Sequence, residues 1–168
     1  RPEVLLGLTA TPERMDGSSI LPDFGDVFAA EIRLPEALEE KLLCPFHYFG
    51  VTDPVDISSE AFWSNGKYDK NALEAVYTGD DLRALQRLDV ILGSLARYQP
   101  DISSTRAVGF CAGVDHAKYM ARKFREKGLQ AEVILGETDS QTRDQRVADF
   151  RKGKITFLFV VDVFSEGI

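Results

Sequence analysis

The sequence predicts an α/β fold in which helices cover a parallel sheet. Three short apolar segments, at residues 107–111, 131–135 and 155–161, are separated by amphipathic segments long enough to form helices. The last segment is apolar apart from Thr156, which is typical of a strand buried on both faces of a sheet. Alternation of strands and helices at this spacing predicts right-handed βαβ units.

The first part of the chain predicts shorter elements. Residues 4–8 are apolar and residues 27–34 alternate weakly, so both are predicted as strands. A short helix is expected to begin at Leu34, because the proline that follows suits a first helical position. Residues 46–51 are rich in aromatic side chains and predict another strand. Residues 52–72 are predicted to be an irregular hinge or insertion.

Three helices are predicted in the rest of the chain, over residues 80–98, 114–127 and 140–152, from the spacing of their apolar side chains. A glycine follows each of the last two, as is common at helix C-termini. Ser140 is expected to cap the last helix. The side chains expected to face the sheet from the last two helices are Ala121, Phe124, Val147 and Phe150.

Length and composition restrict the class of protein. A chain of 168 residues with 44% hydrophobic residues fits one packed domain, or one domain plus fragments. No apolar run approaches the roughly 18 residues that span a bilayer, and no export leader opens the chain. Cys44 and Cys111 are expected to be buried small hydrophobes rather than a disulfide or a metal pair. These features predict a cytoplasmic protein without a membrane partner.

Charge is distributed unevenly along the chain, whose formal net charge is −7. Residues 114–154 hold ten Lys and Arg against seven Asp and Glu, whereas the remaining residues hold ten against twenty. Two interpretations remain open. The positive segment is either an ordinary solvated helix surface or a local electropositive track for phosphate groups.

Loops that follow the predicted strands are the candidate ligand sites, because open parallel sheets bind ligands beyond the carboxyl ends of their strands. These loops are residues 112–115, 136–140 and 162–167. Gly136 permits close backbone approach, and the Thr138 hydroxyl either donates to phosphate or caps a helix. The chain has no phosphate-binding loop of the GxxxxGK[ST] type, no HExxH and no CxxC. The only histidines, at positions 47 and 116, are expected to be structural.

Four short segments follow one another along the chain: residues 8–14 (LTATPER), 108–111 (VGFC), 136–138 (GET) and 161–168 (VDVFSEGI). In this order they resemble motifs of superfamily 2 helicases. The first segment resembles motif III, and the second resembles motif IV. Residues 136–138 (GET), with the arginines at 143 and 146 and the phenylalanine at 150, resemble the strand-grip region IVa. Residues 161–168 (VDVFSEGI) resemble the first part of motif V. The sequence around these motifs is similar to that of the restriction-enzyme-type, DEAD/DEAH-like bacterial helicases.

This resemblance implies a RecA-like parallel sheet flanked by helices. Residues 1–35 would be the tail of a first RecA-like lobe with its linker, and residues 36–168 a second lobe truncated within motif V. The intact parent would be an ATP-dependent helicase that uses ATP and Mg²⁺, and its nucleotide-gripping parts would lie before Arg1 and after Ile168. The fragment alone is therefore expected to be inactive as an ATP hydrolase.

The resemblance also implies roles for individual residues. Thr9, Ala10 and Thr11 would couple the nucleotide state to the nucleic acid. Gly136, Thr138 and Arg143 would hold the backbone of DNA or RNA. Asp162, Glu166 and Gly167 would line the ATP cleft between the second lobe and the missing first lobe. Val161 departs from the family, in which a threonine at that position often contacts the nucleic-acid backbone, so that contact is in doubt.

Two other classes of function stay open from the sequence. The chain could be a non-catalytic α/β interaction module derived from a helicase lobe. A small-molecule enzyme using Glu137 and Asp162 is disfavoured, because no nucleophile lies beside a candidate base. For Arg143 the competing interpretation is a surface ion pair with a nearby acid.

Overall fold

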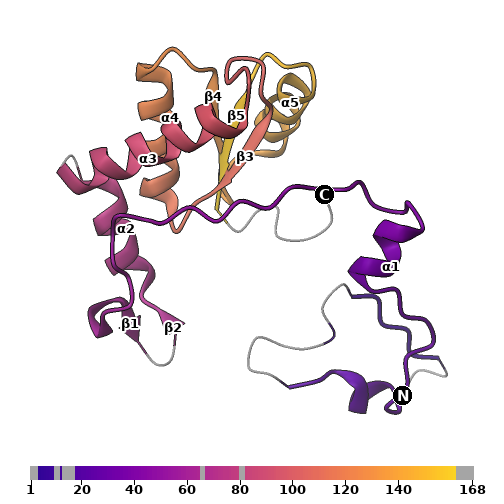
Figure 1. The fold of residues 1–168 in the computed structure, drawn as a ribbon. Coiled ribbons are helices and arrows are strands. Elements are labelled where there is room, and N and C mark those ends of the chain that lie inside the picture. The colour runs from indigo at the N-terminus through magenta and orange to yellow at the C-terminus, as the bar shows by residue number, and fades with distance from the viewer. Residues whose placement is uncertain (1–3, 10–11, 13–17, 65–66, 80–81, 162–168) are drawn as a thin grey trace. The chain divides into compact units, whose positions relative to one another are not determined.

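A computed structural model of the chain describes residues 4–9, 12, 18–64, 67–79 and 82–161 (Figure 1). The chain divides into two compact units, residues 1–49 and residues 50–168. The division lies C-terminal to the boundary at residue 35 that the sequence predicts between the two lobes, and that prediction of lobe identity stays open.

The first unit contains a 3-10 helix, η1 (Leu21–Phe24), and the short helix α1 (Leu34–Glu39). The predicted helix at Leu34 is confirmed, with a proline in its first turn. The predicted strands at residues 4–8 and 27–34 are wrong, and so is the one at residues 46–51. Strands need a hydrogen-bonded neighbour, and the side chains in these stretches stay largely exposed, as the 90% exposure of Leu8 illustrates.

Ordered elements replace part of the irregular segment predicted over residues 52–72. These elements are η2 (Glu60–Phe62), the antiparallel pair β1 (Trp63–Ser64) and β2 (Lys67–Tyr68), and helix α2 (Lys70–Thr78). Asp69 caps α2, because its Oδ1 accepts from the backbone N–H groups of Asn71 and Ala72 at 2.9 and 3.0 Å. Residues 52–59 are irregular as predicted, the described residues from 60 onward are ordered instead, and the hinge interpretation stays a prediction.

The second unit is built on a three-stranded parallel sheet in the order β3-β5-β4, which confirms the predicted fold class. Its elements follow the chain as α3 (Leu82–Tyr98), β3 (Ala107–Phe110), α4 (Val114–Glu126), β4 (Ala131–Ile134), α5 (Ser140–Arg151) and β5 (Phe157–Val160). Strand β5 is central and buried at all four positions, as its apolar sequence predicts.

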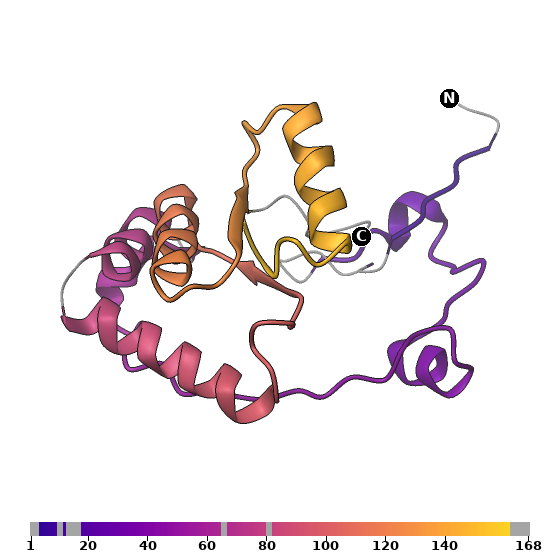
Figure 2. The ribbon, with the colours of Figure 1, turned by 90° about the horizontal axis from the view of Figure 1, so that it is seen from above.

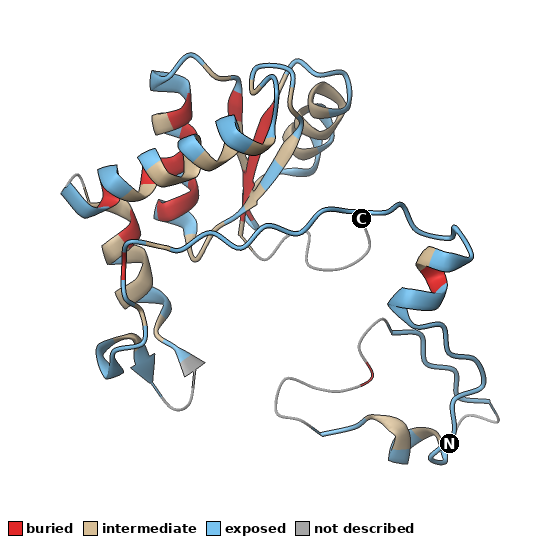
Figure 3. Cartoon of the chain, viewed as in Figure 1, coloured by how far each residue is buried: buried red, intermediate tan, exposed pale blue. Residues whose placement is uncertain are grey.

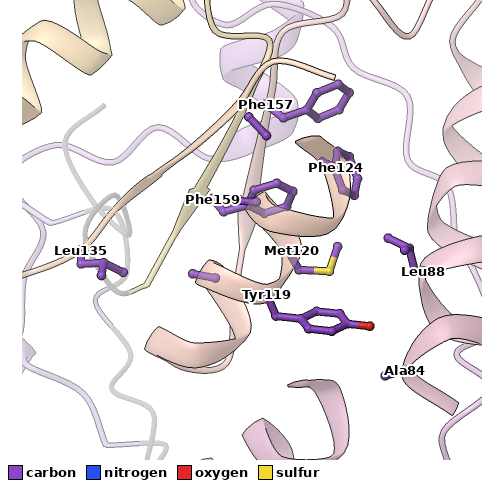
Figure 4. Packing of buried hydrophobic residues seen from close by; sticks show 11 residues of the cluster. Ala84, Leu88, Tyr119, Met120, Phe124, Leu135, Phe157 and Phe159 are labelled. Atoms are coloured by element: carbon purple, nitrogen blue, oxygen red, sulfur yellow. The ribbon is translucent and has the colours of Figure 1, made fainter. Parts of the chain in front are cut away.

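Helices cover both faces of this sheet. Figures 1 and 2 show α3 and α4 on one side of the strands and α5 on the other. On the α4 side, Phe124 packs against Phe157 and Phe159 in the main core (Figure 4). On the α5 side, Leu158 and Val160 form a smaller cluster with partly buried side chains of α5. Alternate residues of β5 thus face opposite helices, as the period of a strand requires.

The side chains predicted to face the sheet do so, but to different degrees. Figure 3 shows buried residues on α4, whereas α5 is coloured as intermediate or exposed. Ala121 and Phe124 are 0% and 2% exposed. Val147 and Phe150 pack against the second cluster and are only half-buried. None of the helices in the described ranges is both long and apolar enough to cross a membrane.

Candidate functional site

The loops that follow the parallel strands share one edge of the sheet. Phe110, Val160 and Ile134 are aligned in the β3-β5-β4 register, so the chain leaves all three strands at the same side. We call this the carboxyl edge and define it by residues 111–116, residues 135–143 and Val161. All three residues predicted for the ATP cleft, Asp162, Glu166 and Gly167, lie outside the described residues.

The loop from β4 to α5 is held by its own polar groups. Thr138 Oγ1 accepts from the Leu135 backbone N–H at 2.9 Å, and the Thr138 N–H donates to the Leu135 carbonyl at 3.1 Å. Asp139, rather than the predicted Ser140, caps α5, since its Oδ1 accepts from the Thr142 N–H at 2.9 Å. The same N–H group lowers the pKa of Asp139, so the cap is ionised at neutral pH.

Arg143 lies at this loop, as the resemblance implies, but its guanidinium points to the chain itself. Nη2 donates to the carbonyls of Leu135 and Gly136 at 3.3 and 3.4 Å. Nε is buried and has no hydrogen-bond partner among the described residues. The competing interpretation of a surface ion pair receives no support in the described residues, because the partners of Arg143 there are backbone carbonyls. Gly136 is exposed, and no atom would crowd a side chain there.

Arg146, one turn further along α5, braces strand β4. Its Nη1 donates to the Val133 carbonyl at 2.5 Å, and its Nη2 lies 3.4 Å from Glu132. The resemblance groups Arg146 with the strand grip, whereas its contacts in this structure are structural. Of the predicted grip, the structure brings together Gly136, Thr138 and Arg143.

The loop from β3 to α4 is fixed by a side chain from α2. Glu74 Oε1 accepts from the backbone N–H groups of Asp115 and His116, at 2.5 and 3.1 Å, and so satisfies the N-terminus of α4. A Cβ atom at position 113 would collide with the Glu74 carboxylate, so a larger residue there would require that flexible side chain to shift. An amide pair that is free in many helices is therefore already occupied by a carboxylate.

A second set of contacts holds the same loop from α3. Arg87 Nε lies 2.6 Å from Asp53 Oδ2, and the guanidinium sits 3.9 Å from the centroid of the Tyr77 ring. Arg87 Nη1 is also 3.3 Å from His116 Nε2. His116 Nδ1 accepts from the Ala112 N–H at 3.2 Å, so the neutral ring carries its proton on Nε2. The contact between Arg87 and His116 is then packing of two donors rather than a hydrogen bond.

This arrangement keeps two side chains neutral. His116 is 4% exposed, and burial, reinforced by the Arg87 charge, lowers its pKa from 6.5 to about 4, although Asp53 opposes the shift. Burial likewise raises the pKa of the Cys111 thiol to about 12, which makes that thiol unreactive. The expectation that His116 is structural agrees with its contacts. Cys44 was expected to be buried and is exposed, so that expectation is wrong.

Sequence reasoning missed the set formed by Asp53, Glu74, Tyr77 and Arg87. Asp53 and Arg87 are 34 positions apart, so no local pattern indicates their contact. One signal was present for α2. Asp69 precedes a segment in which Ala72, Leu73, Val76 and Tyr77 follow helical spacing, and this predicts an amphipathic helix with an N-cap.

The predicted coupling residues belong to the other unit. Thr9 is exposed in the first unit, and Ala10 and Thr11 lie outside the described residues. Within the described parts of the chain, no group of three or more His, Cys, Asp or Glu side chains could hold a metal ion.

Comparison with known proteins identifies the fold. Residues 87–168 match the helicase conserved C-terminal domain. The chain is 30% identical over 163 residues to a 51.5 kDa protein of a Lactococcus phage, which covers 96% of this chain and 33% of that protein. It is 27% identical over 168 residues to irc3, a proposed mitochondrial ATP-dependent helicase of Schizosaccharomyces pombe, with 97% of this chain and 25% of that protein covered.

A further relative is the ATP-dependent RNA helicase FAL1 of Mycosarcoma maydis, 27% identical over 85 residues, with 51% of this chain and 21% of that protein covered. The chain thus spans between about a fifth and a third of the length of these relatives. The match covers α3 from Arg87 onward and the whole parallel sheet with its helices. Residues 87–168 therefore match the helicase C-terminal domain, and the chain carries part of the RecA-like C-terminal lobe of a superfamily 2 helicase.

Proposed function

We propose that the chain is part of an ATP-dependent helicase or translocase that acts on DNA or RNA. The observation that carries the proposal is the match of residues 87–168 to the helicase C-terminal domain. Relatives named as ATP-dependent helicases support the use of ATP, and the name of FAL1 specifies an RNA helicase. A bacterial origin and a cytoplasmic location belong to the same proposal. The remaining parts of the motor, including a first RecA-like lobe, would be its partners.

Within this proposal, the β4–α5 loop contacts the nucleic-acid backbone. Gly136 is open to solvent, the Thr138 hydroxyl is half-buried beside it, and Arg143 lies at the first turns of α5. Backbone N–H groups at a helix N-terminus favour anions. The Arg143 guanidinium, although held by two carbonyls, keeps its charge and has further N–H groups for a phosphate oxygen. Such contacts would be independent of base sequence.

The proposal also assigns one wall of the interlobe ATP cleft to Asp162, Glu166 and Gly167, and the coupling role to Thr9, Ala10 and Thr11. ATP and Mg²⁺ would be bound by the intact motor, where the metal neutralises phosphate charge. The described residues offer no metal cluster, so no step of phosphoryl transfer is assigned to them.

The 168-residue chain should neither bind ATP tightly nor hydrolyse it, because it contains no phosphate-binding loop of the GxxxxGK[ST] type. The measurement is a titration with a fluorescent ATP analogue and magnesium, combined with an assay for released phosphate. Micromolar binding accompanied by turnover would contradict this expectation. It would also contradict the proposal that ATP hydrolysis requires the other parts of the motor.

Arg143→Ala should weaken binding of the helicase to nucleic acid across all sequences and reduce the slope of log affinity against log salt by about one. Arg146→Ala is the matched control, because that arginine is anchored to the same strand by Val133 and Glu132. Melting temperatures of both variants report any loss of bracing. Wild-type affinity and slope for Arg143→Ala would leave the arginine with a structural role only.

A further inference from the structure

The charge of the second unit is opposite at the two edges of its sheet. The carboxyl-edge segments, residues 111–116 and 135–143, contain one arginine against three acids. At the opposite edge, three segments lead into the strands β3, β4 and β5: residues 99–106, 125–130 and 150–156. These contain six Lys and Arg against two acids. We call this the amino edge. A polyanion is therefore attracted to the edge opposite the loops that resemble helicase motifs.

The amino edge is a continuous surface rather than a set of separate loops. The Ala107 N–H donates to the Thr156 carbonyl at 2.8 Å, and the Thr156 N–H donates to the Gln130 carbonyl at 2.9 Å. These bonds hold the starts of β3, β5 and β4 side by side. Arg106 Nη1 donates to the Arg151 carbonyl at 3.0 Å, which places the Arg106 guanidinium at the C-terminus of α5.

Four cations gather at this point: Arg106, Arg151, Lys152 and Lys154, here called the amino-edge cluster. All four are exposed. The one carboxylate that pairs with the cluster among the described residues is Asp149, 3.4 Å from Lys154. Within the described chain, no salt bridge joins an acid to Arg106, Arg151 or Lys152, although the Lys152 charge contributes to lowering the pKa of Asp149.

Helix capping does not account for these cations. Basic residues in a last turn often serve the free carbonyls there. In α5, however, the carbonyls of Ala148, Asp149 and Phe150 already accept from the backbone N–H groups of residues 152–155, and the Arg151 carbonyl accepts from Arg106. The side chains of Arg151 and Lys152 are thus left to the solvent or to a ligand.

We propose that the amino-edge cluster is a second contact surface for the phosphodiester backbone of a nucleic acid, separate from the β4–α5 loop. Nucleic acid is the polyanion class favoured, because residues 87–168 match a helicase domain. The cluster recognises phosphate through exposed guanidinium and ammonium groups, so binding through it is independent of base sequence and sensitive to salt. The inference does not depend on whether Arg143 contacts nucleic acid.

The test compares two double variants of the 168-residue chain. Arg151→Gln with Lys152→Gln removes two cluster charges, and Arg83→Gln with Lys118→Gln removes two exposed charges from α3 and α4. Fluorescence anisotropy measures binding of mixed-sequence single strands of DNA and of RNA, about 16 nucleotides long, between about 50 and 200 mM salt. Melting curves establish that each variant is folded. Photocrosslinking of wild-type chain to the same strands maps the contacted peptides without any substitution.

The cluster variant should lose roughly tenfold in affinity at low salt, and its salt slope should fall by about 1.4, whereas the control variant should keep both values nearly unchanged. Crosslinks should lie in residues 150–156. Equal losses in the two variants, or no measurable binding by the wild-type chain, would overturn the inference. So would binding of polyglutamate, but not of nucleic acid, through the cluster.

Arg143→Ala in the same assay separates this inference from the proposed grip. A loss confined to Arg143→Ala would support the grip and overturn the amino-edge surface. A loss of affinity confined to the cluster variant would support the amino-edge surface and leave no evidence for the Arg143 grip. Losses in both would support two contact surfaces on one lobe.

Discussion

Replacing Phe124 by alanine tests whether the α4 side of the sheet holds the main core. The Phe124 ring is 2% exposed and meets two rings of β5 edge-on. Its centroid lies 4.9 Å from that of Phe157 at 63° and 5.0 Å from that of Phe159 at 77°. Truncation would remove both contacts and leave a cavity between α4 and the central strand.

The expected loss follows from that geometry. Full burial of a phenylalanine and the cavity left by its removal cost about 3–5 kcal/mol. The two edge-on ring contacts place Phe124→Ala toward the upper part of that range, since such pairs contribute about 0.5–1.5 kcal/mol each beyond area burial. A loss of this size should lower the melting temperature by about 10 °C or more for a chain of this length.

Phe150→Ala is the matched comparison on the other face of the sheet. That ring is half-buried against Leu158 and Val160, so its loss should cost about 1–2 kcal/mol. Urea unfolding followed by circular dichroism gives both free energies of unfolding. If Phe124→Ala does not fold, Phe124→Leu should still fold and lose about 1 kcal/mol. Equal losses for the two alanine variants would refute the assignment of the main core to the α4 side.

Two further predictions concern the carboxyl-edge loops and β3. Because the pKa of His116 is about 4 in the folded chain against 6.5 ordinarily, the unfolded state takes up a proton first as the pH falls. The contribution of neutral, buried His116 to stability is fully present above its ordinary pKa of 6.5. It is lost as the pH falls toward 4, by about 3 kcal/mol in total. The pH dependence of urea midpoints should therefore be shallower in His116→Gln, and an unchanged dependence would contradict it. Gly109→Ala should cost about 1–3 kcal/mol, since its Cβ would lie 2.6 Å from the Phe159 ring. Phe159→Leu should relieve that cost, measured by the same unfolding assay.

Sequence patterns predicted the second half of the chain well because burial there repeats with the period of each element. The β5 segment is apolar at nearly every position, and the structure places it centrally between β3 and β4. On α4, Ala117, Ala121 and Phe124 recur at helical spacing and all lie in the core. In such elements, the spacing of apolar residues in the sequence indicates which face is buried.

The patterns failed where an apolar segment has no partner in the described chain. Residues 4–8 satisfy the composition of a strand, yet composition cannot supply the second strand that hydrogen bonding requires. The sequence did not predict the contact between Asp53 and Arg87 for a related reason. This contact forms only when α3 packs against a loop that is distant in the sequence. Ser140 was preferred to Asp139 as the cap, although both side chains suit that position and differ by one residue.

At the carboxyl edge, several of the groups that a phosphate would use already have partners in the chain. Glu74 occupies two amides at the start of α4, and Arg143 is engaged by two carbonyls at the end of β4. A phosphate bound at this edge must compete with these contacts, and it must approach an edge whose described segments carry more acids than bases. At the amino edge the backbone groups of α5 are satisfied, whereas the side chains of Arg151 and Lys152 form no salt bridge within the described chain. Salt-dependent binding that survives Arg143→Ala would follow from this difference, because the counterions that Arg151 and Lys152 displace from the nucleic acid do not depend on the state of the opposite edge.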